Sequence, residues 1–227
     1  MDVVIINSGS NGNCAVIDDT LIIDAGWNCT PKGKYVLLTH HHSDHTKHLD
    51  KMGGLPIYCT GETAEALREK WPYVAFQIVP TDTLLELGDY QIRFTPVKHD
   101  APCVAFDIRK GAERILWATD FSEFLAPINL NAYDALYIEC NNTLYVEDMG
   151  DVYFSETKPK DEFHRRKSFQ NHCNVQYLID MFKQQPCYAP LTLLHRSSHY
   201  YLHNTERIAE LCKVANVTNP LYDVQRV

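Results

Sequence analysis

Within a short stretch the sequence holds four side chains that can bind metal: His40, His42, Asp44 and His45. They follow the continuous apolar run at residues 35–39, which is typical of a buried strand. Beyond the strand end the chain can curl, so that His40 and His42 point one way and the other two point another. This division suits two adjacent metal ions better than one. Imidazole and carboxylate ligands favour Zn²⁺, Fe or Mn²⁺ over Ca²⁺ or Mg²⁺.

Three further candidate ligands each follow an apolar, strand-like run: His99, Asp120 and His195. Ligands at the C-terminal ends of neighbouring strands converge on one edge of a sheet, so these residues could reach the same site. Considered alone, His99 and His195 could equally be histidines held for structural reasons.

The elements that must position these residues change in character along the chain. Apolar patterning and turn signals predict strands at 3–6, 14–18, 21–24, 35–39, 57–59, 84–87, 91–97, 104–109, 114–118, 135–139 and 191–194. They predict helices at 47–52, 62–70, 169–182 and 205–215. We interpret the polar, locally basic segment 155–167 as an excursion or connecting helix within one domain.

Composition narrows the possible function classes. The 227 residues can form one sizeable core, and their net charge of −8 argues against a strong, nonspecific nucleic-acid binder. An enzyme acting on phosphodiesters stays possible, because two divalent cations would add about +4 at the site. The eight cysteines form no CxxC pair, the N-terminus lacks the features of a signal peptide, and long apolar runs are absent. We therefore expect a cytoplasmic protein with reduced thiols and no membrane segment.

The run from His40 to His45 has the form HxHxDH and resembles the hallmark of the metallo-β-lactamase superfamily. The resemblance extends along nearly the whole chain. Residues 7–14 look like the opening of the YycJ/WalJ-like exonuclease branch, and residues 23–26 resemble the superfamily's "DAG". Residues 97–100 resemble the segment that provides the next metal-binding His, and residues 118–120 resemble the segment that provides the bridging Asp. Residues 171–174 lie where ribonuclease Z has "HST", and residues 193–198 resemble the superfamily's final "AHLS" segment.

This resemblance implies an α/β fold, the four-layer αββα sandwich of the metallo-β-lactamase type, with residues 1–227 as a single domain. It also implies two divalent metal ions, with Zn favoured over Mn or Fe. The first ion would be held by His40, His42 and His99, and the second by Asp44, His45 and His195. Asp120 would bridge both, because a carboxylate can hold ions roughly 3.5–4 Å apart through its two oxygens.

The resemblance to ribonuclease Z implies that His172 donates a proton to the leaving group. The alternatives are that His172 replaces His195 as a metal ligand, or that His172 is an ordinary helix residue. We prefer the donor role because His195 closes a predicted strand whereas His172 opens a predicted helix, whose N-terminus lowers an imidazole pKa. Asp44, besides binding metal, could orient the nucleophile.

Several other residues are expected near the site or outside it. Asp24 would accept a hydrogen bond from a ligand imidazole or form a turn. Residues 8–13 would form a backbone nest facing a phosphate, or a plain hairpin turn. Glu139 and Asn141 are placed near the site. The histidines interpreted as non-ligands are His41, His48, His164, His199 and His203.

The leading functional hypothesis is a dinuclear metal-dependent hydrolase, a phosphodiesterase or nuclease that uses a metal-bridged hydroxide. Its substrate would be a phosphodiester such as DNA or RNA, although the chain is shorter than the YycJ/WalJ-like branch and has "NHCN" in place of "GHLSN". A small-molecule hydrolase acting on a cyclic nucleotide, thioester or lactone is the alternative, and the acidic balance favours it slightly. A metal-dependent binding module is disfavoured because the full ligand set is present. The sequence does not define an oligomeric state.

Overall fold

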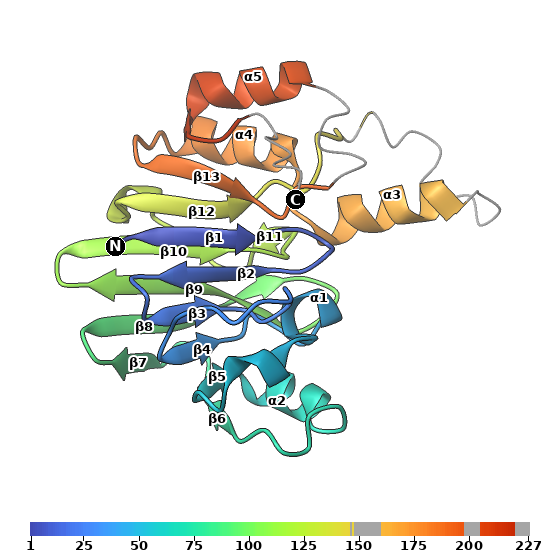
Figure 1. The fold of residues 1–227 in the computed structure, drawn as a ribbon. Helices are drawn as coiled ribbons and strands as arrows, with labels where there is room; N and C mark the ends of the chain where they lie inside the picture. The colour runs from blue at the N-terminus through green and yellow to red at the C-terminus, as the bar shows by residue number, and fades with distance from the viewer. Residues whose placement is uncertain (146, 148–159, 198–204, 221–227) are drawn as a thin grey trace.

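The protein is described by a computed structural model in which residues 1–145, 147, 160–197 and 205–220 are placed. Two β-sheets lie face to face between two helical layers (Figure 1). The first sheet has the order β1 (Val3–Asn7), β2 (Cys14–Ile17), β3 (Leu21–Ile23), β4 (Tyr35–Leu37), β5 (Ile57–Cys59), β6 (Phe76–Ile78). Its first three strands pair antiparallel and the rest pair parallel.

The second sheet is built from the later strands. Its order is β11 (Glu123–Phe124), β8 (Tyr90–Lys98), β9 (Cys103–Lys110), β10 (Glu113–Ala118), β12 (Ala135–Glu139), β13 (Pro190–Leu194), β14 (Asn216–Val217), and β7 (Leu84–Leu87) also pairs with β8. The hairpins from β7 to β10 are antiparallel, whereas β10, β12, β13 and β14 are parallel. The C-terminal ends of these parallel strands therefore meet at one edge.

The helices divide between the two outer faces. Those that follow the first-sheet strands are α1 (Ser43–Thr46), the 3₁₀ helix η1 (Leu49–Met52) and α2 (Gly61–Leu67). Those of the second half are the 3₁₀ helix η2 (Leu130–Ala132), α3 (Lys160–Asn171), α4 (Val175–Gln184) and α5 (Thr205–Val214). In the described part of the chain, none of these helices has the length and apolarity needed to cross a membrane.

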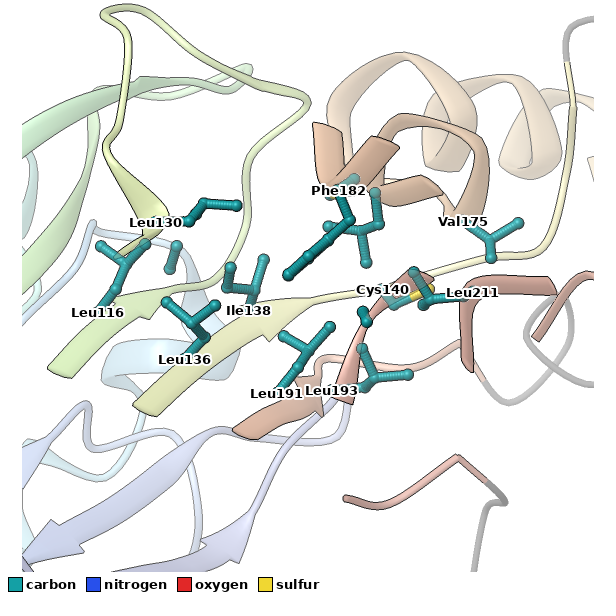
Figure 2. Packing of buried hydrophobic residues seen from close by; sticks show 14 of the residues in the cluster. Leu116, Leu130, Leu136, Ile138, Cys140, Val175, Phe182, Leu191, Leu193 and Leu211 are labelled. Carbon is teal, nitrogen blue, oxygen red and sulfur yellow. The ribbon is translucent and has the colours of Figure 1, made fainter. Parts of the chain in front are cut away.

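Apolar side chains form three layers of core. One cluster lies between the sheets. It contains Phe94 of β8 and Phe106 of β9, which are paired on adjacent strands, have ring centroids 4.9 Å apart and expose no surface. A second lies between the second sheet and α4 and α5, and a third between the first sheet and η1 and α2. Figure 2 shows the second cluster, with alternate residues of β12 and β13 directed towards Phe182 of α4. The predicted αββα sandwich is confirmed.

Two predicted helices differ from those observed. The helix predicted at 169–182 is two helices, because the chain breaks at residues 172–174 and Asn174 caps α4 by accepting a hydrogen bond from the Tyr177 amide at 2.9 Å. The helix predicted at 47–52 is only the 3₁₀ helix η1, ended by Gly53 at a φ of 60°. Strands β6, β11 and β14 were not predicted. Of the ambiguous segment 155–167, only residues 160–167 are described, and they belong to α3.

Candidate metal centre

Strand ends supply three of the seven candidate ligands, as the sequence predicts, whereas Asp44 and His45 lie in the short helix α1. His99 directly follows β8, His195 directly follows β13, and Asp120 lies two residues beyond β10. At Asp120 and His195 the backbone turns sharply, with φ values of 54° and 44°. Residues other than glycine rarely adopt this left-handed conformation, which costs about 1–3 kcal/mol and is concentrated at functional sites. With these turns, Asp120 Oδ1 lies 3.4 Å from His195 Nε2.

The first cluster contains His40, His42, His99 and Asp120, whose candidate ligand atoms lie within 4.8 Å of one another. His40 is fully buried, and its Nε2 atom has no hydrogen-bond partner but lies 3.9 Å from Asp120 Oδ2. Burial holds the pKa of His40 well below its usual value, so the ring is neutral and keeps a lone pair. A buried nitrogen without a partner is costly unless it binds something, and a metal ion fits this requirement.

The second cluster contains Asp44, His45, Asp120 and His195, again within 4.8 Å. His45 Nε2 lies 3.2 Å from Asp120 Oδ1 and 3.5 Å from Asp44 Oδ2. Its other nitrogen donates to Asp24 Oδ2 at 2.7 Å, while the Thr39 amide donates to Asp24 Oδ1 at 2.9 Å. The expectation that Asp24 orients a ligand imidazole therefore agrees with the observed contact, which fixes the ring so that Nε2 faces the cluster.

Asp120 belongs to both clusters, with one oxygen on each side. Oδ2 lies 3.9 Å from Nε2 of both His40 and His99, whereas Oδ1 lies 3.2 Å and 3.4 Å from Nε2 of His45 and His195. Burial alone would raise the pKa of Asp120, but the neighbouring histidines His195 and His45 outweigh it and hold the pKa well below its usual value. The group is therefore an anion placed between two sets of imidazoles.

Buried carboxylates dominate the electrostatics of this region. Burial disfavours a charged His195, yet Asp120, Asp44 and Glu139 raise its pKa to about 10. The same carboxylates would attract metal cations, whose own charge then replaces that of the protonated imidazoles. The donor set, imidazole with carboxylate, fits divalent metal ions.

His172 lies beside the second cluster but not at a helix start. It occupies the break between α3 and α4, and its Nδ1 contacts Glu139 Oε1 at 2.6 Å. Its ring stacks on that of His195, with centroids 5.1 Å apart and an interplanar angle of 6°. Burial lowers the pKa of His172, but the Glu139 carboxylate outweighs burial and raises it above its usual value. Both the predicted helix N-terminus and the lowered pKa were therefore wrong.

Glu139 and Asn141 lie at the site, as expected. Glu139 is completely buried at the end of β12, where Oε2 accepts the Phe121 amide at 2.9 Å and Oε1 lies 3.2 Å from His195 Nδ1. Asn141 donates from its side chain to the His195 carbonyl at 2.9 Å. The atoms of Asp120, Glu139, His172 and His195 also lie within 4.8 Å, so the proton-donor and ligand roles of His172 are both geometrically open.

The loop at residues 8–13 supports the metal-binding loop through the backbone. The Gly9 amide donates to Asn13 Oδ1 at 2.8 Å, and the Gly12 amide donates to the Gly9 carbonyl at 2.9 Å. The Asn13 amide donates to the Asp44 carbonyl at 2.7 Å. These three N–H groups are thus unavailable to a phosphate, which argues against the predicted nest. A Cβ on Gly26 would lie 1.5 Å from the Asp44 carbonyl oxygen, so only glycine allows this approach.

Two side chains at the clusters were not predicted from the sequence. The side chain of Asn13, 2.8 Å from His45 Nε2, and that of Asp100, beside His99, contact the clusters without having been singled out. His41 and His48 lie outside all three clusters. The side chain of His164 and the whole of His199 and His203 lie outside the described residues.

Comparison with known proteins identifies the class to which this fold and site belong. Residues 23–157 match the family model described as the beta-lactamase superfamily domain. This match covers more than half of the chain, which therefore belongs to the metallo-β-lactamase superfamily, as predicted. Proteins of this superfamily are mostly metal-dependent hydrolases, and the His/Asp clusters imply divalent metal ions. No curated protein matches the sequence significantly.

Solved structures share the fold across most of the chain. The metallo-beta-lactamase fold protein YhfI from Bacillus subtilis is 20% identical with a TM-score of 0.64, covering 95% of this chain and 94% of its own. A diphosphatase of the PhnP family is 17% identical with a TM-score of 0.66, covering 95% and 92%. The short form of human tRNase Z is 15% identical with a TM-score of 0.61, covering 88% and 94%. At these identities the likeness establishes the fold alone.

Proposed function

We propose that this protein is a dinuclear metal-dependent phosphodiesterase. The observation that carries the proposal is the position of Asp120, whose two oxygens each face one set of imidazoles. A carboxylate that joins two metal positions is the arrangement that two-metal hydrolases use to stabilise both the attacking and the leaving oxygen.

The two clusters support a ligand set for this proposal. His40, His42 and His99 would hold the first ion, Asp44, His45 and His195 would hold the second, and Asp120 would contribute to both. Zinc suits four-ligand sets of imidazole and carboxylate best, and Mn or Fe would also fit. When bound, the two ions supply a nucleophile from water near neutral pH and neutralise charge on the substrate.

The chain's own residues supply proton transfer and orientation. Asp44 lies 3.4 Å from His195 Nε2 through Oδ2 and is only partly buried, so it can bind metal and orient the attacking group. His172 is held by Glu139 through Nδ1, which leaves Nε2 to donate a proton to the departing oxygen. The raised pKa of His172 favours this role, because a general acid must be protonated when it acts.

The proposed substrate is a phosphodiester, either in DNA or RNA or in a smaller molecule. Support comes from structural neighbours named as a PhnP-family diphosphatase and a tRNase Z. A small-molecule hydrolase acting on a cyclic nucleotide, thioester or lactone is the second candidate, since the net charge of −8 does not favour a long polyanion. We further propose that residues 1–227 form a single domain, because both halves contribute to the core between the sheets. We also propose a cytoplasmic location, because all eight cysteines are free thiols, which is typical of proteins in a reducing compartment.

One experiment tests the proposal directly. The protein, Asp120→Asn and the surface control Asp134→Asn are purified with metal, analysed for metal content and assayed. The substrates are bis-p-nitrophenyl phosphate, single- and double-stranded DNA, RNA, a thioester, a lactone and nitrocefin. We expect about two ions per chain and cleavage of phosphodiesters by the protein and the control only. Turnover confined to the thioester or lactone, or at most one ion per chain, would contradict the proposal.

A further inference from the structure

Asp100 is a carboxylate outside both clusters that contacts two histidines of the first one. It directly follows His99, and its Oδ1 lies 3.1 Å from His99 Nε2 and 3.6 Å from His42 Nε2. Its side chain is 38% exposed, so it lies at the rim of the cluster and not in the core. Among the described residues, these two histidines are the ion-pair partners found for Asp100.

Asn171, the last residue of α3, holds both His99 and Asp100. Its side-chain amide donates to Asp100 Oδ2 at 3.0 Å, and its backbone carbonyl accepts from His99 Nδ1 at 2.9 Å. A proton fixed on Nδ1 of His99 leaves the lone pair of Nε2 free for a metal ion. One residue from a different layer of the fold thus fixes a ligand ring and the carboxylate beside it.

The orientation of His42 adds an independent observation. Its Nδ1 lies 3.4 Å from His99 Nε2, so Nδ1 is the nitrogen on the cluster side of the ring. Its Nε2 faces Asp100 on the outer side. A carboxylate on the far nitrogen of a ligand imidazole fixes the tautomer and makes the ring a stronger metal ligand.

We propose that Asp100, held by Asn171, is a positioning residue that sets the affinity of the first metal site. It orients His42 through the outer nitrogen of the ring, and it adds negative charge beside His99 Nε2, the nitrogen that faces the cluster, without replacing any of the ligands. This inference rests on the proposed function, since it requires that His40, His42, His99 and Asp120 bind a metal ion. It predicts that the first site depends on Asp100 and that the second does not.

The test measures zinc affinity by competition with a chelator, using metal-free protein refilled with Zn²⁺. The variants are Asp100→Asn, Asp100→Ala, Asn171→Ala and the control Glu123→Gln. Glu123 pairs with Lys98, the residue before His99, so its change also removes one negative charge nearby without touching a cluster histidine. Each substitution is also introduced into the His195→Ala variant. In that variant only the first cluster keeps all of its candidate ligands.

We expect Asp100→Ala to weaken the first site by about 10–100-fold while the second keeps its affinity, the range typical of lost partners of ligand histidines. Asp100→Asn should be milder because an amide oxygen can still accept a hydrogen bond, and Asn171→Ala milder again because the carbonyl that binds His99 remains. Glu123→Gln should stay within about twofold of the parent. Equal weakening of both sites would indicate a general structural role and overturn the inference, as would an Asp100→Ala affinity equal to the control. A parent protein that binds no zinc would instead overturn the proposed function.

Discussion

Replacing His172 and His195 separately should produce different defects, although the two rings stack on one another. His195 directly ends β13 with Nε2 near both Asp44 and Asp120, so His195→Ala should deplete the second metal ion. His172 contacts Glu139 through Nδ1, so His172→Ala should leave both ions bound and remove the proton donor. The loss of a general acid costs about 10²–10⁴-fold in turnover, which is about 3–5 kcal/mol of barrier.

The choice of leaving group tests whether His172 acts as a proton donor. p-Nitrophenolate departs without a proton, so His172→Ala should slow that reaction much less than cleavage of a dinucleotide, whose leaving group is an alkoxide. Glu139→Gln should lower the pKa of His172, because the carboxylate that raises it is gone. Since the acid must be protonated, the decline of dinucleotide cleavage at high pH should then move to lower pH. The measurements are metal content, turnover on both substrates and a pH profile. Loss of metal in His172→Ala but not in His195→Ala would reverse the assignment, and equal slowing on both substrates would refute proton donation.

Three further changes test other parts of the structure. Asp120→Ala should abolish turnover and lower metal content while thermal unfolding stays cooperative, and normal metal occupancy would show that Asp120 does not bridge. Gly26→Ala should lower the melting temperature and metal content, because its Cβ would overlap the Asp44 carbonyl. The matched control Gly61→Ala, where the nearest atom lies 3.8 Å from the added Cβ, should change neither, and equal effects of the two would refute the steric argument. Hydrogen bonds from Lys110, the Asp2 amide and Tyr90 outweigh burial and lower the pKa of Asp18 to about 2. This carboxylate therefore adds stability above about pH 4 that is lost as pH falls towards 2. Denaturant unfolding at pH 5 and pH 3 should therefore show a smaller drop for Asp18→Asn than for the parent, and an unchanged drop would contradict this assignment.

The HxHxDH run and the strand ends were readable in the sequence because both are local. His40 to His45 lie within six consecutive residues that run into α1. Strands β8, β10 and β13 are rich in apolar residues and end within two residues of His99, Asp120 and His195. Features that depend on tertiary contacts could not be predicted from the sequence. The left-handed turns at Asp120 and His195 have no reliable residue signal, since they persist only because surrounding contacts impose them.

The region around His172 was predicted incorrectly for a different reason. Its apolar and polar residues continue a helical pattern, which hid the break between α3 and α4. Asn174 just before the apolar start of α4 was an available signal, because asparagine is a preferred N-cap. Asp100 and Asn171 could not have been linked, because their contact joins residues 71 positions apart in the chain.

The candidate ligands come from both sheets, and on the proposed function this distribution determines when metal can be bound. Residues 40–45 follow a strand of the first sheet, whereas His99, Asp120 and His195 follow strands of the second. A ribosome must therefore have synthesised the chain through His195 before the second set is complete, so on the proposed function the second ion could bind only after that point. Ions bound by the proposed ligands would connect the two sheets and would stabilise only the folded state. At a free concentration of 100 times the dissociation constant, each ion would add about 2.7 kcal/mol to the free energy of unfolding. Metal supply in the cell would then govern how long the protein survives proteolysis as well as whether it is active.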